Sequence, residues 1–168
     1  MSTLSVDTIQ GKTTAGTVAM PAGMVIQTAT TLSIVNNGSY TSTSLSHIST
    51  FDVAFTPKFS NSLIRVSWNG QVDLSTSGAA NPWFSMSFFQ DSTDLNNQTG
   101  LTYNGSNYQQ FIVSSGGGTK YINFVDMFDA GSTSSRTYKI YIRVGNTDYS
   151  ANLSMPSRRR MIVEEIKQ

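Results

Sequence analysis

The sequence predicts an all-β fold, an antiparallel β-sandwich or jelly roll of about eight strands with an extended N-terminal segment. Three observations lead to this prediction. Apolar residues alternate with polar ones along most of the chain. Gly and Asn punctuate the segments between these stretches, and no window of a dozen residues has the spacing of an amphipathic helix. We find no internal repeat of fixed period, which disfavours propellers and β-helices.

The chain divides into a short N-terminal segment and a β-domain. Residues 1–23 are small, polar and rich in Thr and Gly, so they cannot form a hydrophobic core of their own. Residues 24–168 contain all the stretches with strand-like alternation. We therefore expect an extended attachment segment and linker over 1–23 and one sandwich domain over 24–168.

The clearest strand lies between Ser62 and Leu74. Its apolar residues fall on one face and its polar residues on the other, as in a strand with one wet side. Gly70 occupies an apolar position within it, which predicts a bulge or the close approach of a neighbouring backbone or ring.

A second regular strand is expected from Arg136 to Val144, with Tyr138 and Ile140 on the inner face. Less regular apolar stretches complete the set of about eight strands: Met24 to Ala29, Leu45 to Phe55, Trp83 to Phe89, Gln110 to Val113, Tyr121 to Phe128 and Met161 to Ile166. We expect the aromatic residues Phe84, Phe88, Phe124 and Phe128 to exceed what one core needs and to be buried by threefold packing of chains.

Composition excludes several classes of protein. Charged residues make up 12% of the 168 residues, the net charge is +1 and cysteine is absent. Binding of a nucleic acid usually requires a stripe of basic residues on the protein surface. The only cluster of basic residues in this sequence is Arg158 to Arg160, so we expect no nucleic-acid partner. Disulfides and zinc–thiolate sites are excluded. No segment has the length of a membrane span or the pattern of a secretory signal, so we expect synthesis in a cytoplasm and no membrane insertion.

No catalytic constellation is evident. His47 is the only histidine, and its neighbours look like an ordinary strand. Glu164 and Glu165 resemble a glycosidase pair in residue type, but adjacent strand residues point to opposite faces and cannot flank one substrate. We expect one of the two to face inward and to pair with an arginine among Arg158, Arg159 and Arg160. The chain is predicted not to be an enzyme.

Two loops were candidates for ligand sites. Asp91, Asp94 and Asn96 carry oxygens suited to calcium but lack the spacing of a known calcium loop, so a solvated hairpin loop is favoured. Gly116 to Lys120 lacks the spacing of a phosphate loop and precedes a strand, so it is expected to be a hairpin tip. We expect no metal and no cofactor.

Aromatic residues in loops are candidates for glycan contact. Trp83, Tyr103, Tyr108 and Tyr149 lie among Gly, Asn and Ser residues. Exposed rings among amides can stack on sugar faces. The alternative is that each ring packs under its own loop or at a subunit interface.

The two ends of the chain resemble a known family. The opening LSVDTIQGKT, a Thr/Ala/Gly/Val linker and MPAGMVIQ, with the closing strand IVEEIKQ, are similar to the ends of short fibre proteins of marine tailed bacteriophages, including those of cyanobacteria. The resemblance covers Leu4 to Gln27 and Met161 to Gln168. It departs from longer fibres in having no shaft between the two parts.

This resemblance implies a trimeric virion fibre or knob with a jelly roll similar to that of tumour necrosis factor. The docking residues would be Leu4, Val6, Thr8, Ile9 and Gln10, and ion pairs of the closing strand would involve Arg158 to Arg160, Glu164 and Glu165. The expected role is in the tail or adsorption apparatus, with other virion proteins as partners. The alternatives are a lectin-like module that binds host glycan, and a capsid decoration or head fibre.

Overall fold

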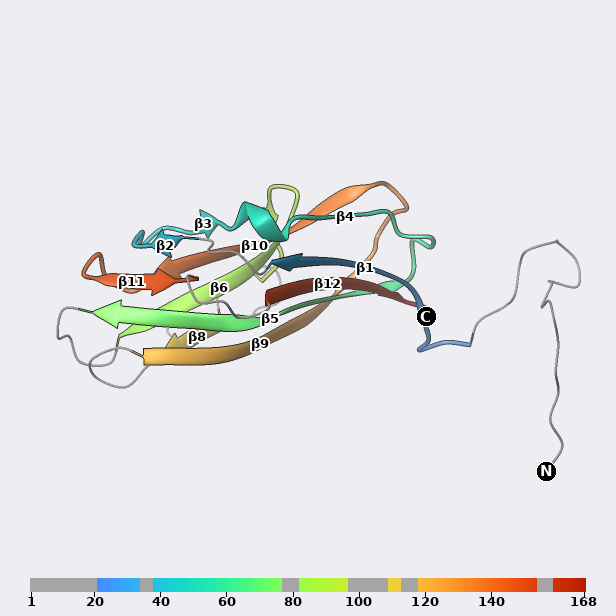
Figure 1. Cartoon of the computed structure of the whole chain (residues 1–168). Helices are drawn as coiled ribbons and strands as arrows, with labels where there is room; N and C mark the ends of the chain where they lie inside the picture. The colour runs from blue at the N-terminus through green and yellow to red at the C-terminus, as the bar shows by residue number, and fades with distance from the viewer. Residues whose placement is uncertain (1–20, 34–37, 77–81, 97–108, 113–117, 154–158) are drawn as a thin grey trace, which may run out of the picture.

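The strands of the chain form two antiparallel sheets (Figure 1). The computed structural model describes residues 21–33, 38–76, 82–96, 109–112, 118–153 and 159–168, with the backbone alone for 109–112. The first sheet contains β1 (Val25–Ser33), β2 (Ser39–Tyr40), β5 (Leu63–Thr76), β9 (Gly118–Asp129), β11 (Tyr149–Asn152) and β12 (Arg159–Ile166). The second contains β3 (Ser46–His47), β4 (Val53–Phe55), β6 (Trp83–Gln90), β7 (Thr93–Asp94), β8 (Gln109–Ile112) and β10 (Arg136–Val144).

The first sheet is four strands wide. β9 pairs with β5 along one edge, and β12 and β11 follow one another along the other edge of β5. β1 pairs with β12 and β2 with β11, so the order across the sheet is β9, β5, β12 and β1. In the second sheet β10 lies between β6 and the pair β3 and β4, and β6 is flanked on its other edge by β7 and β8.

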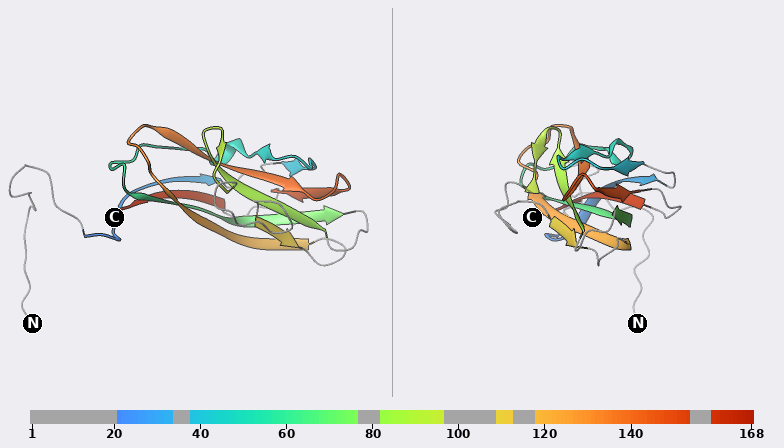
Figure 2. Two further views of the ribbon diagram at one scale, coloured as in Figure 1. Left: turned by 180° about the vertical axis from the view of Figure 1, so that it is seen from behind. Right: turned by 90° about the vertical axis from the view of Figure 1, so that its left-hand side faces the viewer.

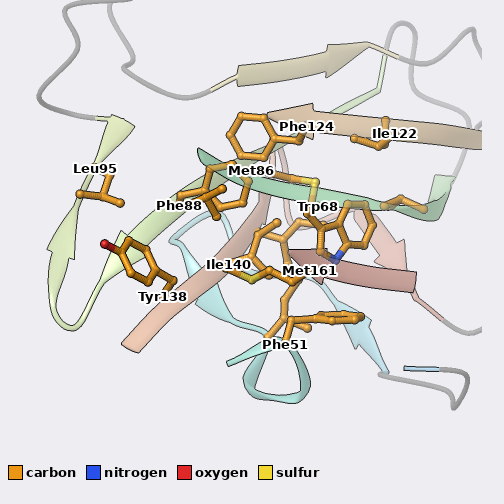
Figure 3. Close-up of a cluster of buried hydrophobic side chains, with 14 of the residues drawn as sticks. Phe51, Trp68, Met86, Phe88, Leu95, Ile122, Phe124, Tyr138, Ile140 and Met161 are labelled. Atoms are coloured by element: carbon orange, nitrogen blue, oxygen red, sulfur yellow. The ribbon is translucent and has the colours of Figure 1, made fainter. Parts of the chain in front are cut away.

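The hydrophobic core lies between the two sheets (Figures 2 and 3). Phe88 of β6 stacks on Phe124 of β9, with ring centroids 4.2 Å apart and planes 4° apart. Trp68 of β5 meets the edge of Phe51 at 5.9 Å. Phe51 belongs to a short 3-10 helix, Ser49–Phe51, and the described residues contain no α-helix. The all-β prediction is therefore confirmed, in a sandwich-like arrangement.

The two regular strands agree with the sequence. In β5 and β10 the expected inner residues are buried, including Trp68 and Tyr138. Gly70 has the predicted close neighbours: a Cβ atom there would lie 2.5 Å from Cγ of Arg159 and 2.7 Å from the Trp68 ring. The structure adds short strands that were not predicted, namely β2, β7 and β11, and it divides the expected strand Leu45 to Phe55 into β3 and β4.

Three aromatic residues expected at a subunit interface lie instead inside one chain. Phe84 and Phe88 are fully buried and Phe124 is almost so, while Phe128 is half-buried against the same core. The expectation of surplus core aromatics was wrong because two four-strand-wide sheets need large rings to fill the space between them.

Candidate functional site

The outer face of the first sheet is unusually apolar. Seven large hydrophobic side chains are exposed among the described residues, and five of them lie on this face: Val25, Leu32, Tyr121, Val125 and Met127. Half-buried Leu63, Ile162 and Ile166 lie in the same rows. We call these eight residues the apolar face. Exposed large hydrophobic side chains that gather on one face of a sheet are typical of an interaction surface, so this is the strongest candidate for a functional surface.

The charges at the centre of the apolar face neutralise one another. Arg65 of β5 lies directly opposite Glu164 of β12, and its Nη2 is 2.7 Å from Oε2 of Glu164. Its Nε donates to the same oxygen, also at 2.7 Å. A neighbouring protein surface could therefore cover this pair without leaving either charge without its partner.

A hollow and a projecting ring lie at different places on this sheet. The hollow has a volume of about 260 Å³ and is lined by Leu32, Asn69, Arg160 and Ile162, which come from β1, β5 and β12. Tyr121 of β9 is 81% exposed, more than any other large hydrophobic side chain described. Because β5 lies between β9 and β12, this ring is on the far side of β5 from Arg160 and Ile162.

The outer face of the second sheet has a different character. His47, Tyr141 and Phe89 form a row of rings there, with centroid separations of 4.9 Å and 4.0 Å. His47 Nε2 donates to Oδ1 of Asp52 at 2.6 Å. Among the described residues no serine hydroxyl is hydrogen-bonded to His47, so the geometry of a Ser-His-Asp triad is not present there.

Glu165 lies on the inner side of β12 and is fully buried. Its carboxylate accepts hydrogen bonds from the backbone amides of Lys58 and Phe59, at 2.8 Å and 2.9 Å, and from the Ser62 hydroxyl at 2.6 Å. Gln27 Nε2 donates to it at 2.6 Å. The predicted inward orientation of one glutamate is confirmed. The predicted arginine partner is wrong, because the Glu165 carboxylate accepts its hydrogen bonds from neutral donors of the 56–62 turn and of β1 instead.

The net effect of these contacts is a lowered pKa of Glu165. Burial alone raises its pKa, but the amide of Lys58, the hydroxyl of Ser62, the amide of Phe59 and the side chain of Gln27 lower it together by more. The group is therefore ionised at neutral pH although it is buried. It fixes the turn before β5 to the last strand of the chain.

The arginines of the closing strand take different positions. Arg159 is fully buried and donates through Nη1 to the carbonyl oxygen of Leu153. Burial lowers its pKa, and the nearby Asp73 carboxylate and Tyr40 hydroxyl oppose that shift. Arg160 is exposed at the hollow. Arg158 lies outside the described residues.

Of the aromatic residues expected to contact glycan, the two that are described, Trp83 and Tyr149, lie in different sheets. Trp83 is half-buried on the outer side of β6, with the Arg143 guanidinium 5.6 Å from its ring centre. Tyr149 is buried in β11 of the other sheet, so it packs within the chain. Tyr103 and Tyr108 lie outside the described residues.

The acidic loop after β6 forms a hydrogen-bond network. Asp94 accepts from the Ser87 hydroxyl, and Asn96 accepts from the backbone amide of Phe88 at 2.7 Å. Asn96 also donates to Asp126 of β9 at 2.9 Å and so joins the two sheets. Asp91 adopts a positive φ of 55° in the turn before β7. Among the described residues no group of three or more acidic, His or Cys side chains is placed to hold a metal ion.

The predicted docking residues Leu4, Val6, Thr8, Ile9 and Gln10 lie outside the described residues. The point from which that segment leaves the domain is described. Gly23 donates its amide to the carbonyl of Lys167 at 2.7 Å, and the amide of Lys167 donates to Met24 at 3.0 Å. The described chain therefore begins and ends at the same end of the sheets (Figure 1).

Comparisons with known proteins add no family. No protein-family model matches the chain, and no curated protein sequence matches it. No helix in the described part of the chain is long and apolar enough to cross a membrane.

The apolar face had a signal in the sequence: from Tyr121 to Phe128 apolar residues occupy both faces of the strand, which indicates a second buried surface.

Proposed function

We propose that the chain is a structural protein of a bacteriophage particle, a small trimeric fibre or knob of the tail or adsorption apparatus. Residues 1–23 attach it to other virion proteins, and the β-domain projects from the particle. It is made in the host cytoplasm and acts in the virion, without enzymatic activity, cofactor or nucleic-acid partner. The observation that carries the proposal is the apolar face. Hydrophobic side chains gathered on one face of a sheet indicate a surface that is covered by another protein copy rather than by water.

The apolar face supports assembly from copies of the same chain. It combines exposed aliphatic and aromatic side chains with an ion pair that is already neutral, the composition of the core of a protein interface. None of the seven exposed large hydrophobic side chains belongs to a strand of the second sheet. Assembly through the first sheet leaves the second sheet facing outward.

The projecting Tyr121 ring and the hollow offer complementary features for the contact between neighbouring copies. Tyr121 lies on the edge strand β9, whereas the hollow lies across β5 from it. When Tyr121 of one copy enters the hollow of the next, the two contacting patches differ. Repeated around a threefold axis, this contact gives a closed ring of three copies.

The strand order supports a jelly roll as the finer description of the fold. When β2, β3, β7 and β11 are left out, the strand order is β1, β12, β5, β9 in one sheet and β4, β10, β6, β8 in the other. The eight strands cross between the sheets as in a double Greek key. This arrangement, together with the resemblance of the chain ends, favours the knob of a phage fibre.

The position of the chain ends supports attachment through the N-terminal segment. Gly23 and Lys167 are hydrogen-bonded to each other, at the opposite end of the sheets from the turn between β10 and β11. A segment that leaves at this end can contact the particle while the other end points away from it. A head fibre or capsid decoration would use the same geometry.

Deletion of residues 1–22 tests this attachment and leaves the Gly23 contact in place. We expect the shortened chain to remain folded and to keep the oligomeric state of the full chain. In an infection where it replaces the full chain, it should be absent from purified particles. Its incorporation at the normal level would contradict the proposal.

A second candidate is a lectin-like adsorption module, and the position of Trp83 favours it. The ring lies on the second sheet, away from the apolar face, with Arg143 above it. Binding to a glycan array that is lost in Trp83→Ala and Tyr103→Ala would support this role. Phe59→Ala is the matched control, because Phe59 is an exposed ring at the attached end.

A further inference from the structure

A cleft of about 520 Å³ opens at the end of the sheets where the chain ends leave. It lies where β5 begins at Leu63, β6 ends at Gln90 and β9 ends at Asp129. We call it the base cleft. Its volume is within the range of sites that bind small molecules.

Arg136 supplies positive charge to the base cleft. It is the first residue of β10 and lies on the inner side of that strand, opposite buried Phe55. Its Nη1 donates to the carbonyl of Ala130 at 2.8 Å, and its Nη2 donates to the Ser132 hydroxyl at 2.9 Å. Both acceptors are neutral, and no ion pair of Arg136 occurs within the described residues.

The guanidinium is therefore fixed in position with donors to spare. It has five N–H groups, of which the two hydrogen bonds use two. An arginine side chain that is already fixed and has unused N–H groups is suited to bind a carboxylate. Little conformational freedom of the side chain is then lost when the carboxylate binds.

The hydroxyl of Tyr138 lies one inner position farther along β10. It is fully buried beside the Arg136 side chain. Burial raises the pKa of this hydroxyl, and Arg136 lowers it by less through its charge and through hydrogen bonding, so the proton is retained. Figure 3 shows the hydroxyl on the side of the core where Leu95 lies, and Leu95 lines the base cleft.

The remaining walls define what else the ligand must carry. Asp129, Gln90 and Thr93 line the cleft with hydrogen-bonding groups, and Phe128 and Leu95 provide an apolar wall. The negative charge of Asp129 disfavours the binding of a simple anion. Its carboxylate oxygens can, however, accept hydrogen bonds from hydroxyl groups of a ligand. The combination selects a ligand with a carboxylate, several hydroxyls and one apolar face.

We propose that the base cleft binds a polyhydroxylated carboxylate, a hexuronic acid unit of an acidic polysaccharide. Its carboxylate binds Arg136, its hydroxyls bind Asp129, Gln90 and Thr93, and the C–H face of its ring lies against Phe128. This inference goes beyond the structural role. Because Leu63 and Met127 belong both to the base cleft and to the apolar face, a neighbouring copy in the trimer would border the cleft.

Methionine methyl resonances of the full chain test the proposal. Met127 lines the base cleft, whereas Met86 and Met161 are fully buried in the core and serve as internal controls. With ¹³C-methyl methionine, titration with digalacturonate to about 10 mM should shift the Met127 signal saturably and leave the other two unchanged. Met127→Leu assigns the signal.

Three variants and one ligand control decide the outcome. Arg136→Gln should weaken binding about tenfold or more through loss of the charged hydrogen bonds, and Thr93→Val should weaken it less. Lys58→Gln, which removes an exposed charge at the same end of the domain, should bind normally. Neutral methyl galactoside should bind at least about tenfold more weakly than the uronate.

The proposal is overturned by the absence of a saturable Met127 shift, or by equal binding of the neutral sugar. If Arg136→Gln disturbs the turn that it holds, Thr93→Val remains as the test, because Thr93 is exposed and its replacement keeps the same shape. Binding by folded Thr93→Val or Arg136→Gln with unchanged affinity also overturns it.

Discussion

The carboxylate of Glu165 accepts a hydrogen bond from the backbone amide of Lys58 at 2.8 Å, across 107 residues of sequence. Phe59 and Ser62 donate to the same carboxylate, so the turn that precedes β5 is held by the last strand of the chain. Lys167, two residues farther on, pairs with Met24 at the start of the domain. These contacts connect both ends of the domain to one buried charge.

Glu165→Gln should destabilise the domain strongly. The amide side chain cannot accept all the hydrogen bonds that the carboxylate accepts, and bonds to a charged group contribute about 1.5–3 kcal/mol each. We expect a loss of about 2–4 kcal/mol, measured as a lower midpoint in thermal unfolding followed by circular dichroism. Asp148→Asn is the control, because it neutralises an exposed carboxylate in the turn between β10 and β11, away from the apolar face, and should cost less than about 0.5 kcal/mol. Equal midpoints for the two variants would contradict this role of Glu165.

The lowered pKa of Glu165 also predicts how stability depends on pH. Its folded pKa lies below the unfolded value, so the folded state binds fewer protons in that window. This contribution is fully present above the unfolded pKa of about 4.3 and is lost as pH falls through the folded pKa. The difference in midpoint between the wild type and Glu165→Gln should therefore be constant from pH 7 to about pH 5 and shrink below about pH 4. A difference that grows on acidification would refute this assignment.

Gly70→Ala should destabilise the core by overpacking. The added methyl group would lie 2.5 Å from Cγ of Arg159 and 2.7 Å from the Trp68 ring, and both side chains are fully buried. We expect a loss of about 1–3 kcal/mol in the same thermal assay. Asn69→Ala, on the outer side of the same strand, should change the midpoint little. An unaltered midpoint for Gly70→Ala would show that this part of the core has room to relax.

Val125→Asp should dissociate the assembly without unfolding the chain. Val125 is 44% exposed in the centre of β9, so a charge there is tolerated in a single copy but is buried without a partner in an interface. We expect a smaller mass in light scattering with an unchanged circular dichroism spectrum. Ala54→Asp, exposed in β4 of the second sheet, should keep the wild-type mass. Equal masses for both variants would exclude β9 from the interface.

The sequence predicted those features that strict alternation encodes. β5 and β10 have one buried and one wet face, so their limits and inner residues follow from a period of two. Gly70 was recognisable because a glycine at an inner strand position indicates a close neighbour. The opposite orientations of Glu164 and Glu165 followed from the same geometry.

The remaining features depend on contacts between distant segments. The strands β2, β3 and β7 have two residues each, too few to show any period. The partners of Glu165 could not be predicted, because backbone amides of a turn 106 and 107 residues away carry no signal in residue type. Tyr149 illustrates the same limit: its loop-like neighbours indicated exposure, but pairing of β11 with β5 buries it.

The most direct test of the trimeric fibre or knob is the mass of the purified full chain in solution, measured by light scattering. One chain has a mass of 18.3 kDa. The account predicts a stable species of about 55 kDa, three copies joined through the apolar face. A monomer at micromolar concentration, or a twofold dimer, would contradict it.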